Sequence, residues 1–392
     1  MIIISNSYTF LEKNKEQIKA ELLKLVHAES PSEDLAAIHT CANVLKDLFE
    51  EKLQETFTLT EYDEDGRPHL KYEIKNSQKP RILFLSHFDT VWNIGDLEIT
   101  EQENRIYGPG VFDMKAGLLS SIWAIYALTQ TEDELPISPV FLFTSDEEIG
   151  SLSSRPIIED VAKTCDAVFI MEPPAAHSNA LKTERKGVGI FHIIVKGVSA
   201  HAGNHHEDGV NAILEMAKVV QKLESLTDYE RGTTVNVGTI RGGSGTNVVP
   251  DSAEIDVDLR FKTADEGNRI KAIIESLTPE DSRTELKVNG DLNRPPLEKN
   301  DANQALFKLA KQASEQIGIN VQATHVGGGS DGNFTSAIGV PTLDGLGIPG
   351  DGPHARHEHI LFDMFVERCA LVAETSLQYA LKKDKNLAKH VE

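Results

Sequence analysis

Residues 81–90 read RILFLSHFDT, an apolar segment that ends in a histidine and an aspartate. The segment 81–85 predicts a short buried strand, because a brief apolar run is typical of a strand covered on both faces. His87 and Asp89 lie two positions apart, so in extended backbone their side chains project to the same side. This spacing suits a metal-binding imidazole with a carboxylate that orients it. A local hydrogen bond and a turn cap are the simpler alternative.

Three further apolar segments lie next to acidic residues. They are the helix 115–128, which is apolar nearly all round, and the strands 139–143 and 167–171. The acids beside them are Asp113, Glu147, Glu148 and Glu172. Strands that alternate with helices predict an α/β fold with a mostly parallel sheet covered on both faces. Such sheets bind ligands beyond the carboxyl ends of their strands, where these acids are expected.

Each acid also has a simpler interpretation. Asp113 could cap the helix that follows it. Glu147 and Glu148 could form a solvated acidic loop, and Glu172 could be a polar loop residue. Adjacent carboxylates repel each other unless something positive holds them, so one of Glu147 and Glu148 could bind a metal while the other acts as general base.

A histidine-rich segment near the C-terminus supplies the last candidates. Residues 350–359 read GDGPHARHEH, and chemistry alone does not choose among His354, His357 and His359 as a ligand. Two histidines and three carboxylates, one of them bridging, suit a pair of divalent ions held about 3.5–4 Å apart. The whole set therefore favours a metal site over separate caps and turns.

The middle of the chain has a different pattern. Strands and amphipathic helices follow in the order β-α-β-β-α-β, at residues 189–195, 209–226, 233–240, 253–261, 268–277 and 284–288. That order is the ferredoxin-like arrangement. We therefore predict a three-layer α/β catalytic domain made of residues 1–185 and 296–392, with residues 186–295 inserted as a compact α+β domain.

Composition limits the possible functions. The 392 residues include 39 Lys and Arg against 61 Asp and Glu, a formal net charge of −22, which argues against nucleic acid or an anionic membrane as partner. Three scattered cysteines give no disulfide framework and fit a reducing compartment. No secretory signal pattern is found, and the apolar stretch 117–128 is shorter than the roughly 20 residues that span a bilayer. These features predict a soluble cytoplasmic enzyme.

Five motifs follow one another along nearly the whole chain: SHFDTV (86–91), GPGVFDMK (108–115), TSDEEIG (144–150), MEP (171–173) and GDGPHARHEH (350–359). As a set they resemble the metal-site motifs of the zinc-dependent aminoacylase/carboxypeptidase family. That family includes glutamate carboxypeptidase, aminoacylase, acetylornithine deacetylase, succinyl-diaminopimelate desuccinylase and several dipeptidases. The resemblance implies hydrolysis of an amide bond at two zinc ions, and it matches residues 186–295 to the family's lid, or dimerisation, domain.

The resemblance also implies a set of metal ligands. Asp113 would bridge the two zinc ions. His87 and Glu172 would complete one site, and Glu148 and His354 the other. Cobalt or manganese could replace zinc, because oxygen and nitrogen ligands do not select zinc by affinity alone.

Further roles follow from the same resemblance. His354 is the preferred histidine because Glu358 lies four residues later, as in the family pattern. Asp89 would orient the ligand His87, Glu147 would be the general base, and the peptide bond after Asp113 would be cis.

The resemblance also places substrate-binding residues in the inserted domain and the loop 327–331. His201 resembles a lid histidine that reaches the partner subunit's active site and stabilises the oxyanion, and a surface loop histidine is the alternative. Asn247 matches an asparagine that contacts substrate. Arg260 and Arg294 fit carboxylate-binding arginines, since arginine suits bidentate carboxylate recognition, although surface ion pairs are the alternative. Gly328 and Gly329 would let backbone amides approach the substrate carboxylate.

The predicted function is therefore a di-zinc hydrolase that resembles glutamate carboxypeptidase. It would cleave an amide or peptide bond next to a free carboxylate of a small substrate and form a homodimer through the lid. An N-acyl amino acid deacylase or a dipeptidase on the same scaffold is the alternative. A catalytically inactive binding homologue is disfavoured, because all the expected positions are filled.

Overall fold

The computed structural model describes residues 5–54, 56–74 and 78–389, with side chains described as far as Lys383. By its internal contacts the chain forms two compact units. The first contains the chain up to Glu184, Lys299–Val326 and the chain from Ser330 onward. The second contains Arg185–Glu298 and Gly327–Gly329.

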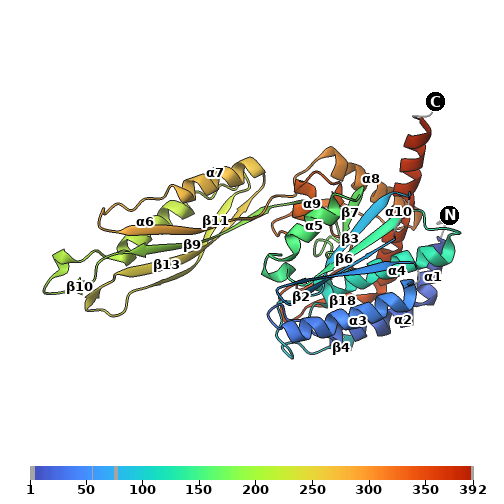
Figure 1. Ribbon diagram of the computed structural model, residues 1–392, viewed down its shortest axis with the longest axis horizontal. Coiled ribbons are helices and arrows are strands. Elements are labelled where there is room, and N and C mark those ends of the chain that lie inside the picture. Colours follow the sequence, from blue (N-terminus) through green and yellow to red (C-terminus); the bar gives the residue numbers. More distant parts are fainter. Residues whose placement is uncertain (1–4, 55, 75–77, 390–392) are drawn as a thin grey trace. The chain divides into compact units, whose positions relative to one another are not determined.

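The first unit is built on a six-stranded sheet in the order β1-β2-β6-β3-β7-β16 (Figure 1). Its strands are β1 (Thr58–Glu64), β2 (Arg67–Glu73), β3 (Arg81–His87), β6 (Ser138–Thr144), β7 (Ala167–Ile170) and β16 (Thr342–Leu343). The strand β3 pairs in parallel with β6 and β7, β16 pairs in parallel with β7, and the hairpin β1–β2 adds to β6 in antiparallel fashion. The prediction of a mostly parallel sheet is confirmed, but the hairpin was not predicted.

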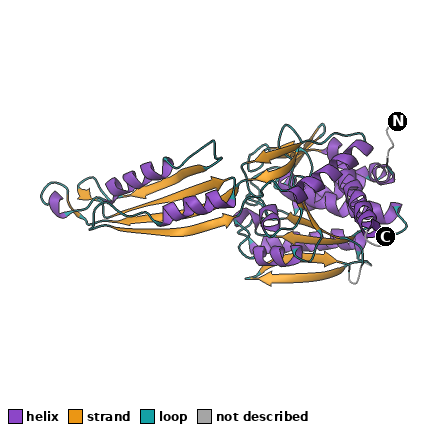
Figure 2. Ribbon diagram, turned by 90° about the horizontal axis from the view of Figure 1, so that it is seen from above, coloured by secondary structure: helices purple, strands orange, loops and turns teal. Residues whose placement is uncertain are grey.

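Helices cover both faces of this sheet, as Figure 2 shows. Along β3, Ile82 and Phe84 pack into one core, and Leu83 and Leu85 pack into another. The first core includes side chains of α1 (Asn6–Lys13), α2 (Lys15–His27), α3 (Leu35–Leu53), α4 (Ala116–Thr131), α8 (Asp301–Gln316) and α10 (Phe365–Lys389), and the second includes those of α5 (Ser154–Ala162) and α9 (Gly332–Ala337). The unit therefore has three layers, as predicted.

Local hydrogen bonds set the bounds of the N-terminal helices. The helices α1 and α2 are divided at Asn14, whose backbone angles are φ −102° and ψ 11° and whose side-chain amide donates to the carbonyl of Phe10 at 2.8 Å. Asparagine favours such breaks because its side chain competes for backbone groups. The helix α3 starts at Leu35, because Asp34 caps it by accepting the N–H of Ala37 at 3.0 Å.

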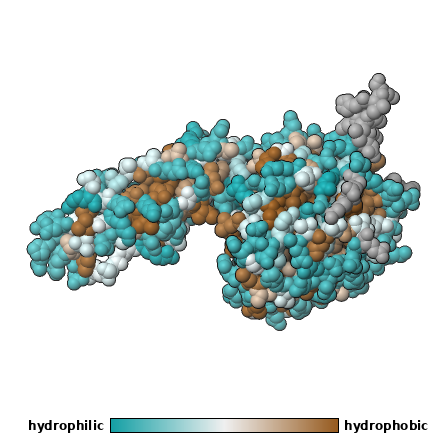
Figure 3. All heavy atoms as spheres, in the orientation of Figure 1, coloured by the Kyte–Doolittle hydropathy of each residue, from teal (hydrophilic) through white to brown (hydrophobic). Residues whose placement is uncertain are grey.

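The apolar helix is longer than expected. Together with η1 (Val111–Lys115) it runs over Val111–Thr131, which is long and apolar enough to cross a membrane by composition alone. However, 89% of the 18-residue apolar stretch within this segment is buried inside the protein. Burial of this extent is typical of a helix in the core of a folded protein. Elsewhere hydrophilic side chains cover much of the surface seen in Figure 3, in keeping with the acidic surplus.

The second unit has the order β-α-β-β-α-β. Its elements are β9 (Gly187–Lys196), α6 (Ala212–Glu224), β11 (Thr234–Gly242), β13 (Ser252–Phe261), α7 (Ala264–Glu275) and β14 (Glu285–Arg294). The sheet order is β11-β13-β9-β14, and every pairing in it is antiparallel. Every second residue of β13 is buried, so one face of the sheet packs on α6 and α7. This is the predicted ferredoxin-like arrangement.

Short ribbons complete both units. In the first unit β4 (Thr100–Gln102), β5 (Arg105–Tyr107), β17 (Gly350–Asp351) and β18 (His359–Leu361) form a small sheet. The strand β15 (Ala323–Val326) pairs with β8 (Leu181–Arg185). In the second unit β10 (Ala200–His201) pairs with β12 (Val248–Val249).

Candidate active site

The ends of strands in the first unit bring the predicted metal ligands together. His87 is the last residue of β3, and Glu148 lies in η2 (Glu147–Ile149), the turn that follows β6. Glu172 lies two residues beyond β7, Asp113 lies in η1 before α4, and His354 lies between β17 and β18. The ligands from β3, β6 and β7 thus share the carboxyl-terminal edge of the parallel strands, where α/β sheets bind ligands.

Asp113 lies between two groups of ligand atoms. Its Oδ1 is 3.4 Å from Nε2 of His87, and that nitrogen is 3.5 Å from Oε1 of Glu172. Its Oδ2 is 3.5 Å from Nε2 of His354, and that nitrogen is 3.0 Å from Oε2 of Glu148. Each oxygen of one carboxylate therefore faces a separate pair made of an imidazole and a carboxylate.

The donor atoms fit a cation. Nε2 of His87 and Oδ1 of Asp113 are buried and have no hydrogen-bond partner among the residues that the structure describes. Nδ1 of His87 lies 3.1 Å from the main-chain oxygen of Asp89, so in the neutral ring Nδ1 carries the proton and the lone pair of Nε2 faces the carboxylates. A buried lone pair and buried carboxylates are costly together unless something positive lies between them. Ligand atoms of His87, Asp113 and Glu148 lie within 4.8 Å of one another, so a metal ion fits this set.

The clustered charges shift the protonation of these groups. Burial disfavours a charged His87, but the neighbouring carboxylates of Asp113, Asp89 and Glu172 raise the pKa of His87 well above its usual range. Bonds to Asp113 and Glu148 raise the pKa of His354 to about 11. Burial, and then the charge of Asp113, raise the pKa of Glu148 to about 7. Protons and a metal ion would therefore compete for the same imidazoles.

Asp89 connects His87 to the turn that carries the two adjacent glutamates. Its buried carboxylate accepts the N–H of Glu147 at 3.1 Å and the N–H of Glu148 at 3.2 Å. It also accepts the hydroxyl of Ser32 at 2.8 Å. The sequence predicted Asp89 beside His87, but it gave no sign of the bonds to the turn or of Ser32.

Glu358 and Trp92 support the backbone of Asp113. One oxygen of Glu358 accepts the N–H groups of Phe112 at 3.0 Å and Asp113 at 3.1 Å, and the other accepts the indole N–H of Trp92 at 2.7 Å. Burial raises the pKa of Glu358 to about 7. The Asp113–Met114 peptide bond is cis, as the resemblance implies.

The structure also separates the three histidines of the segment 350–359. In the described part of the chain, His354 is the one of these three histidines that lies beside Asp113 and Glu148. His359 lies against the ring of Tyr107, with the ring centroids 5.0 Å apart.

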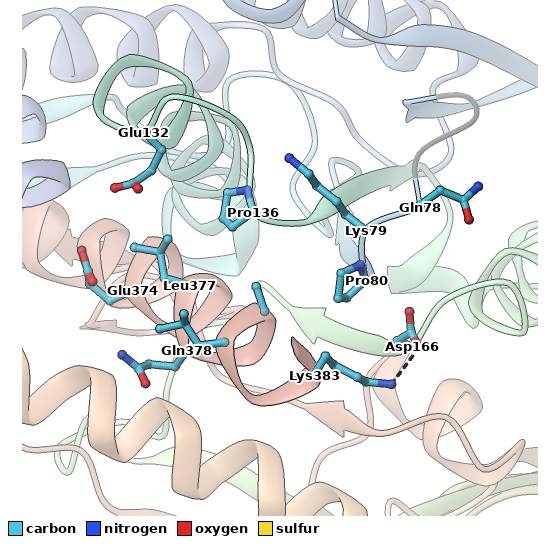
Figure 4. A pocket seen from close by; sticks show the side chains of 12 residues that line it. Gln78, Lys79, Pro80, Glu132, Pro136, Asp166, Glu374, Leu377, Gln378 and Lys383 are labelled. Atoms are coloured by element: carbon cyan, nitrogen blue, oxygen red, sulfur yellow. Dashed lines mark hydrogen bonds and ion pairs between the residues drawn. The ribbon is translucent and has the colours of Figure 1, made fainter. Parts of the chain in front are cut away.

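A cavity of about 810 Å³ in the first unit lies away from these ligands (Figure 4). Pro80 and Asp166, which directly precede β3 and β7, line it together with residues of α10, and Lys383 of α10 bonds to Asp166 at 2.9 Å. It therefore opens at the amino-terminal edge of the sheet. No predicted site residue lines it, so it is not the candidate active site.

The predicted oxyanion-stabilising His201 and the predicted substrate-binding Asn247 share one ribbon of the second unit. His201 ends β10, and Asn247 directly precedes β12, the strand that pairs with β10. Nδ1 of His201 accepts the N–H groups of Gly203 and Asn204, both at 3.1 Å. A neutral His201 therefore carries its proton on Nε2, where the ring can donate a hydrogen bond.

The glycine loop of the second unit packs on two buried arginines. A Cβ on Gly329 would lie 3.0 Å from Cδ of Arg294, so the loop can lie this close only because glycine has no side chain. One guanidinium nitrogen of Arg185 donates to the carbonyls of Gly328 at 3.1 Å and Gly329 at 3.0 Å. Sequence analysis identified Arg294 and the glycines but missed Arg185.

Arg260 has a different environment. Its Nε and its terminal nitrogen bond to the two oxygens of Asp258, each at 2.8 Å, in a half-exposed ion pair. This is the simpler interpretation of Arg260, because Asp258 occupies the bidentate position that a substrate carboxylate would need.

The comparisons with known proteins agree with this site. Residues 83–378 match the model of peptidase family M20/M25/M40. The match covers more than half of the chain, so this protein belongs to that family. It is a metallopeptidase or related amidohydrolase, and the predicted family and enzyme class are confirmed.

Individual relatives differ in activity. Carboxypeptidase G2 of Pseudomonas sp. (strain RS-16) is 27% identical over 347 residues, which cover 85% of this chain and 82% of the relative. Succinyl-diaminopimelate desuccinylase of Dechloromonas aromatica is 29% identical, covering 67% of this chain and 74% of the relative. Among solved structures, the Bacillus subtilis protein YXEP, described as a dinuclear metal-binding peptidase of the M20 family, superposes with a TM-score of 0.66 at 17% identity, covering 93% of this chain and 98% of the other.

Proposed function

We propose that this protein is a di-zinc hydrolase that cleaves an amide or peptide bond next to a free carboxylate, in the manner of a glutamate carboxypeptidase. The observation that carries the proposal is Asp113, each of whose oxygens faces a separate imidazole. The similarity to carboxypeptidase G2 supports the substrate class. Cobalt or manganese are alternatives to zinc that this ligand set would also accept.

The two ions would share Asp113 as a bridging ligand. His87 and Glu172 would hold one ion, and Glu148 and His354 the other. When bound, the ions would lower the pKa of a water molecule and polarise the amide carbonyl.

Proton transfer would be the task of Glu147. Its carboxylate would take the proton from the attacking water and deliver it to the leaving amine, as a general base that becomes a general acid. Its backbone N–H donates to the buried carboxylate of Asp89, and this bond holds the turn that carries the proposed base. Nδ1 of His87 lies 3.1 Å from the main-chain oxygen of Asp89 and 3.4 Å from its Oδ1, so Asp89 would orient that ligand.

The second unit would bind the substrate. Nε2–H of His201 would stabilise the oxyanion, and Asn247 on the same ribbon would contact the substrate. Arg294, with Gly328 and Gly329, would bind the carboxylate, and Arg260 could do so only by releasing Asp258. We further propose that this unit is the lid, that it forms a homodimer, and that the protein works in the cytoplasm on small substrates.

An N-acyl amino acid deacylase or dipeptidase is the second candidate. The 29% identical desuccinylase supports this second candidate, because a desuccinylase removes a succinyl group, which is an acyl group. The two candidates differ in the acyl group and the amino acid that the enzyme prefers.

A substrate panel with and without a chelator tests the proposal. We expect zinc-loaded protein to cleave N-acyl-glutamates faster than N-acetyl amino acids or free dipeptides, and we expect the chelator to abolish cleavage until zinc is restored. Preference for N-acetyl amino acids or free dipeptides would favour the second candidate. Cleavage that survives chelation would contradict a metal-dependent mechanism.

A further inference from the structure

The segment before α3 lies against the site and has no role in the mechanism above. We propose that Ser32 of this segment and Arg67 of β2 are positioning residues that act through Asp89. They hold the carboxylate of Asp89 in register with the turn Glu147–Ile149. The kinetic part of this inference rests on the proposed function.

Ser32 is tied to the Asp89 segment by main chain and side chain. Its hydroxyl donates to Oδ2 of Asp89 at 2.8 Å, with the carbonyl of Thr90 as a second and longer acceptor at 3.1 Å, and its N–H donates to that same carbonyl at 3.0 Å. The N–H of Thr90 donates in turn to the carbonyl of Ser30 at 2.9 Å, and Pro31 and Thr90 form a parallel bridge. Ser32 is only 5% exposed. The hydroxyl is therefore fixed in place beside the carboxylate.

Arg67 connects the same segment to the turn. One of its guanidinium nitrogens donates to the carbonyl of Ser32 and to the carbonyl of Ser145, both at 2.8 Å. Ser145 follows β6 and lies two residues before Glu147. The guanidinium of Arg67 thus connects two residues. One is Ser32, whose hydroxyl bonds to Asp89, and the other is Ser145, which leads from β6 into the turn.

The orientation of Asp89 matters because its carboxylate serves both sides of the site. Oδ1 accepts the N–H of Glu147 and lies 3.4 Å from Nδ1 of His87. Oδ2 accepts the hydroxyl of Ser32 and the N–H of Glu148. Without the hydroxyl, Oδ2 would keep the 3.2 Å amide bond and lose the shorter 2.8 Å bond, so the carboxylate plane would be held less firmly. The imidazole and the turn would both be affected.

The segment itself offers a matched control. Ser30 is fully buried two residues away, and its hydroxyl donates to the main-chain carbonyl of Phe88 rather than to a carboxylate. Ser30→Ala therefore removes a buried hydroxyl of the same segment without touching Asp89. Ser32→Thr keeps a hydroxyl at the critical position.

The experiment measures zinc affinity by chelator competition, together with kcat and KM on the best substrate of the panel. We expect Ser32→Ala to bind zinc about tenfold more weakly, at the lower end of losses for groups behind metal ligands. We expect kcat to fall with KM nearly unchanged, Ser32→Thr to restore most of both losses, and Ser30→Ala to change zinc affinity and kcat much less. Equal losses in Ser30→Ala and Ser32→Ala would overturn the proposal.

Arg67→Met provides an independent variant. We expect it to weaken zinc binding in the same direction, and its effect should not add fully to that of Ser32→Ala because both act through Asp89. Full additivity, or unchanged affinity in Arg67→Met, would contradict the role of Arg67. Wild-type protein that binds zinc but cleaves no panel substrate would refute the proposed function, while the zinc affinities of the variants would still decide the positioning role.

Discussion

Two adjacent glutamates in one turn are expected to do different work. Glu148 lies 3.0 Å from His354 and belongs to the ligand cluster, whereas Glu147 shares with it the backbone anchor on Asp89. We predict that Glu147→Gln lowers kcat by about 10²–10⁴-fold, because an amide cannot accept the proton of water. Zinc content, measured by metal analysis, should stay at the wild-type level.

Glu148→Gln is the matched control for that variant. It removes a charged ligand and should lower zinc content as well as activity. If Glu147→Gln kept most of its activity, or lost zinc as Glu148→Gln does, the assignment of the base would be wrong.

Arg294 tests recognition of the carboxylate. It is buried against the glycine loop, and guanidinium–carboxylate bonds contribute roughly 1.5–3 kcal/mol. We predict that Arg294→Ala raises KM by about 10–100-fold for a substrate with a free carboxylate, but much less for the amidated analogue of that substrate. The ratio of the two KM values cancels general damage to the fold. An equal rise for both substrates would exclude a direct role in carboxylate binding.

The predicted ligands show what a sequence can reveal about a site. Each of His87, Glu148 and Glu172 lies at the end of an apolar strand or shortly after it, and the strands of a parallel sheet end at one edge. The supporting residues lack such a signal. The indole of Trp92 and its acceptor Glu358 are 266 residues apart, and only the folded chain shows that they meet.

At the scale of elements, α7 begins with a charge network around the buried Glu266. Glu266 accepts the hydroxyl of Thr233 at 2.8 Å and two bonds from Arg269 at 2.7 and 2.8 Å. Bonds from Arg269 lower the pKa of Glu266 to about 2, against the effect of burial. The ionised group stabilises the fold above the unfolded-state pKa of about 4.3, and that stabilisation is lost as the pH falls from there towards 2.

We predict that Glu266→Gln lowers the free energy of unfolding by about 1–3 kcal/mol at pH 7. The difference from the wild type should shrink between about pH 4.3 and 2, as measured by denaturant unfolding at each pH. Glu275→Gln in the same helix is the control, because that side chain is 52% exposed. A difference that does not depend on pH would contradict the charge network as its cause.

The buried helix α4 offers a test in which two principles give opposite signs. Alanine is a better helix former than glycine by about 1 kcal/mol, so propensity predicts that Gly117→Ala stabilises the protein. However, a Cβ on Gly117 would lie 1.9 Å from the main-chain oxygen of Met171, next to the candidate ligand Glu172. We predict a loss of about 1–3 kcal/mol on thermal or chemical unfolding, the usual cost of overpacking, with weaker zinc binding. A stabilised variant would show that the main chain of Met171 moves far enough to accommodate the added Cβ.

The elements themselves were predicted where burial gives a clear pattern. The strand β13 was recognised because every second residue faces a core. The strand β3 was recognised because every residue after Arg81 is buried. The hairpin strand β1 was missed because its seven residues, TLTEYDE, are all exposed or half-exposed and so carry no apolar periodicity. Its place at the edge of the sheet comes from pairing with β2, which composition does not reveal.

At the scale of the whole molecule, the candidate ligands and the candidate substrate-binding groups belong to different units. His87, Asp113, Glu148, Glu172 and His354 all lie in the first unit. His201, Asn247, Arg260, Arg294, Gly328 and Gly329 all lie in the second. The net charge of −22 includes buried carboxylates of the first unit, such as Glu172, for which we propose a role separate from that of the solvated surface.

This division predicts a localised effect of metal. A ligand that binds only the folded state stabilises it by about 4 kcal/mol at a thousandfold excess over its dissociation constant. We predict that zinc slows hydrogen exchange of the most protected amides of β3, β6 and α4, by up to about a thousandfold, while those of β9 and β13 change little. Hydrogen–deuterium exchange with zinc and with a chelator measures both sets in one sample. In Asp113→Asn, which loses the charge of the proposed bridging ligand, the zinc-dependent protection should largely disappear. A comparable rise in both units would mean instead that they unfold as one cooperative body, and zinc bound to the first unit would then stabilise the substrate-binding unit as well.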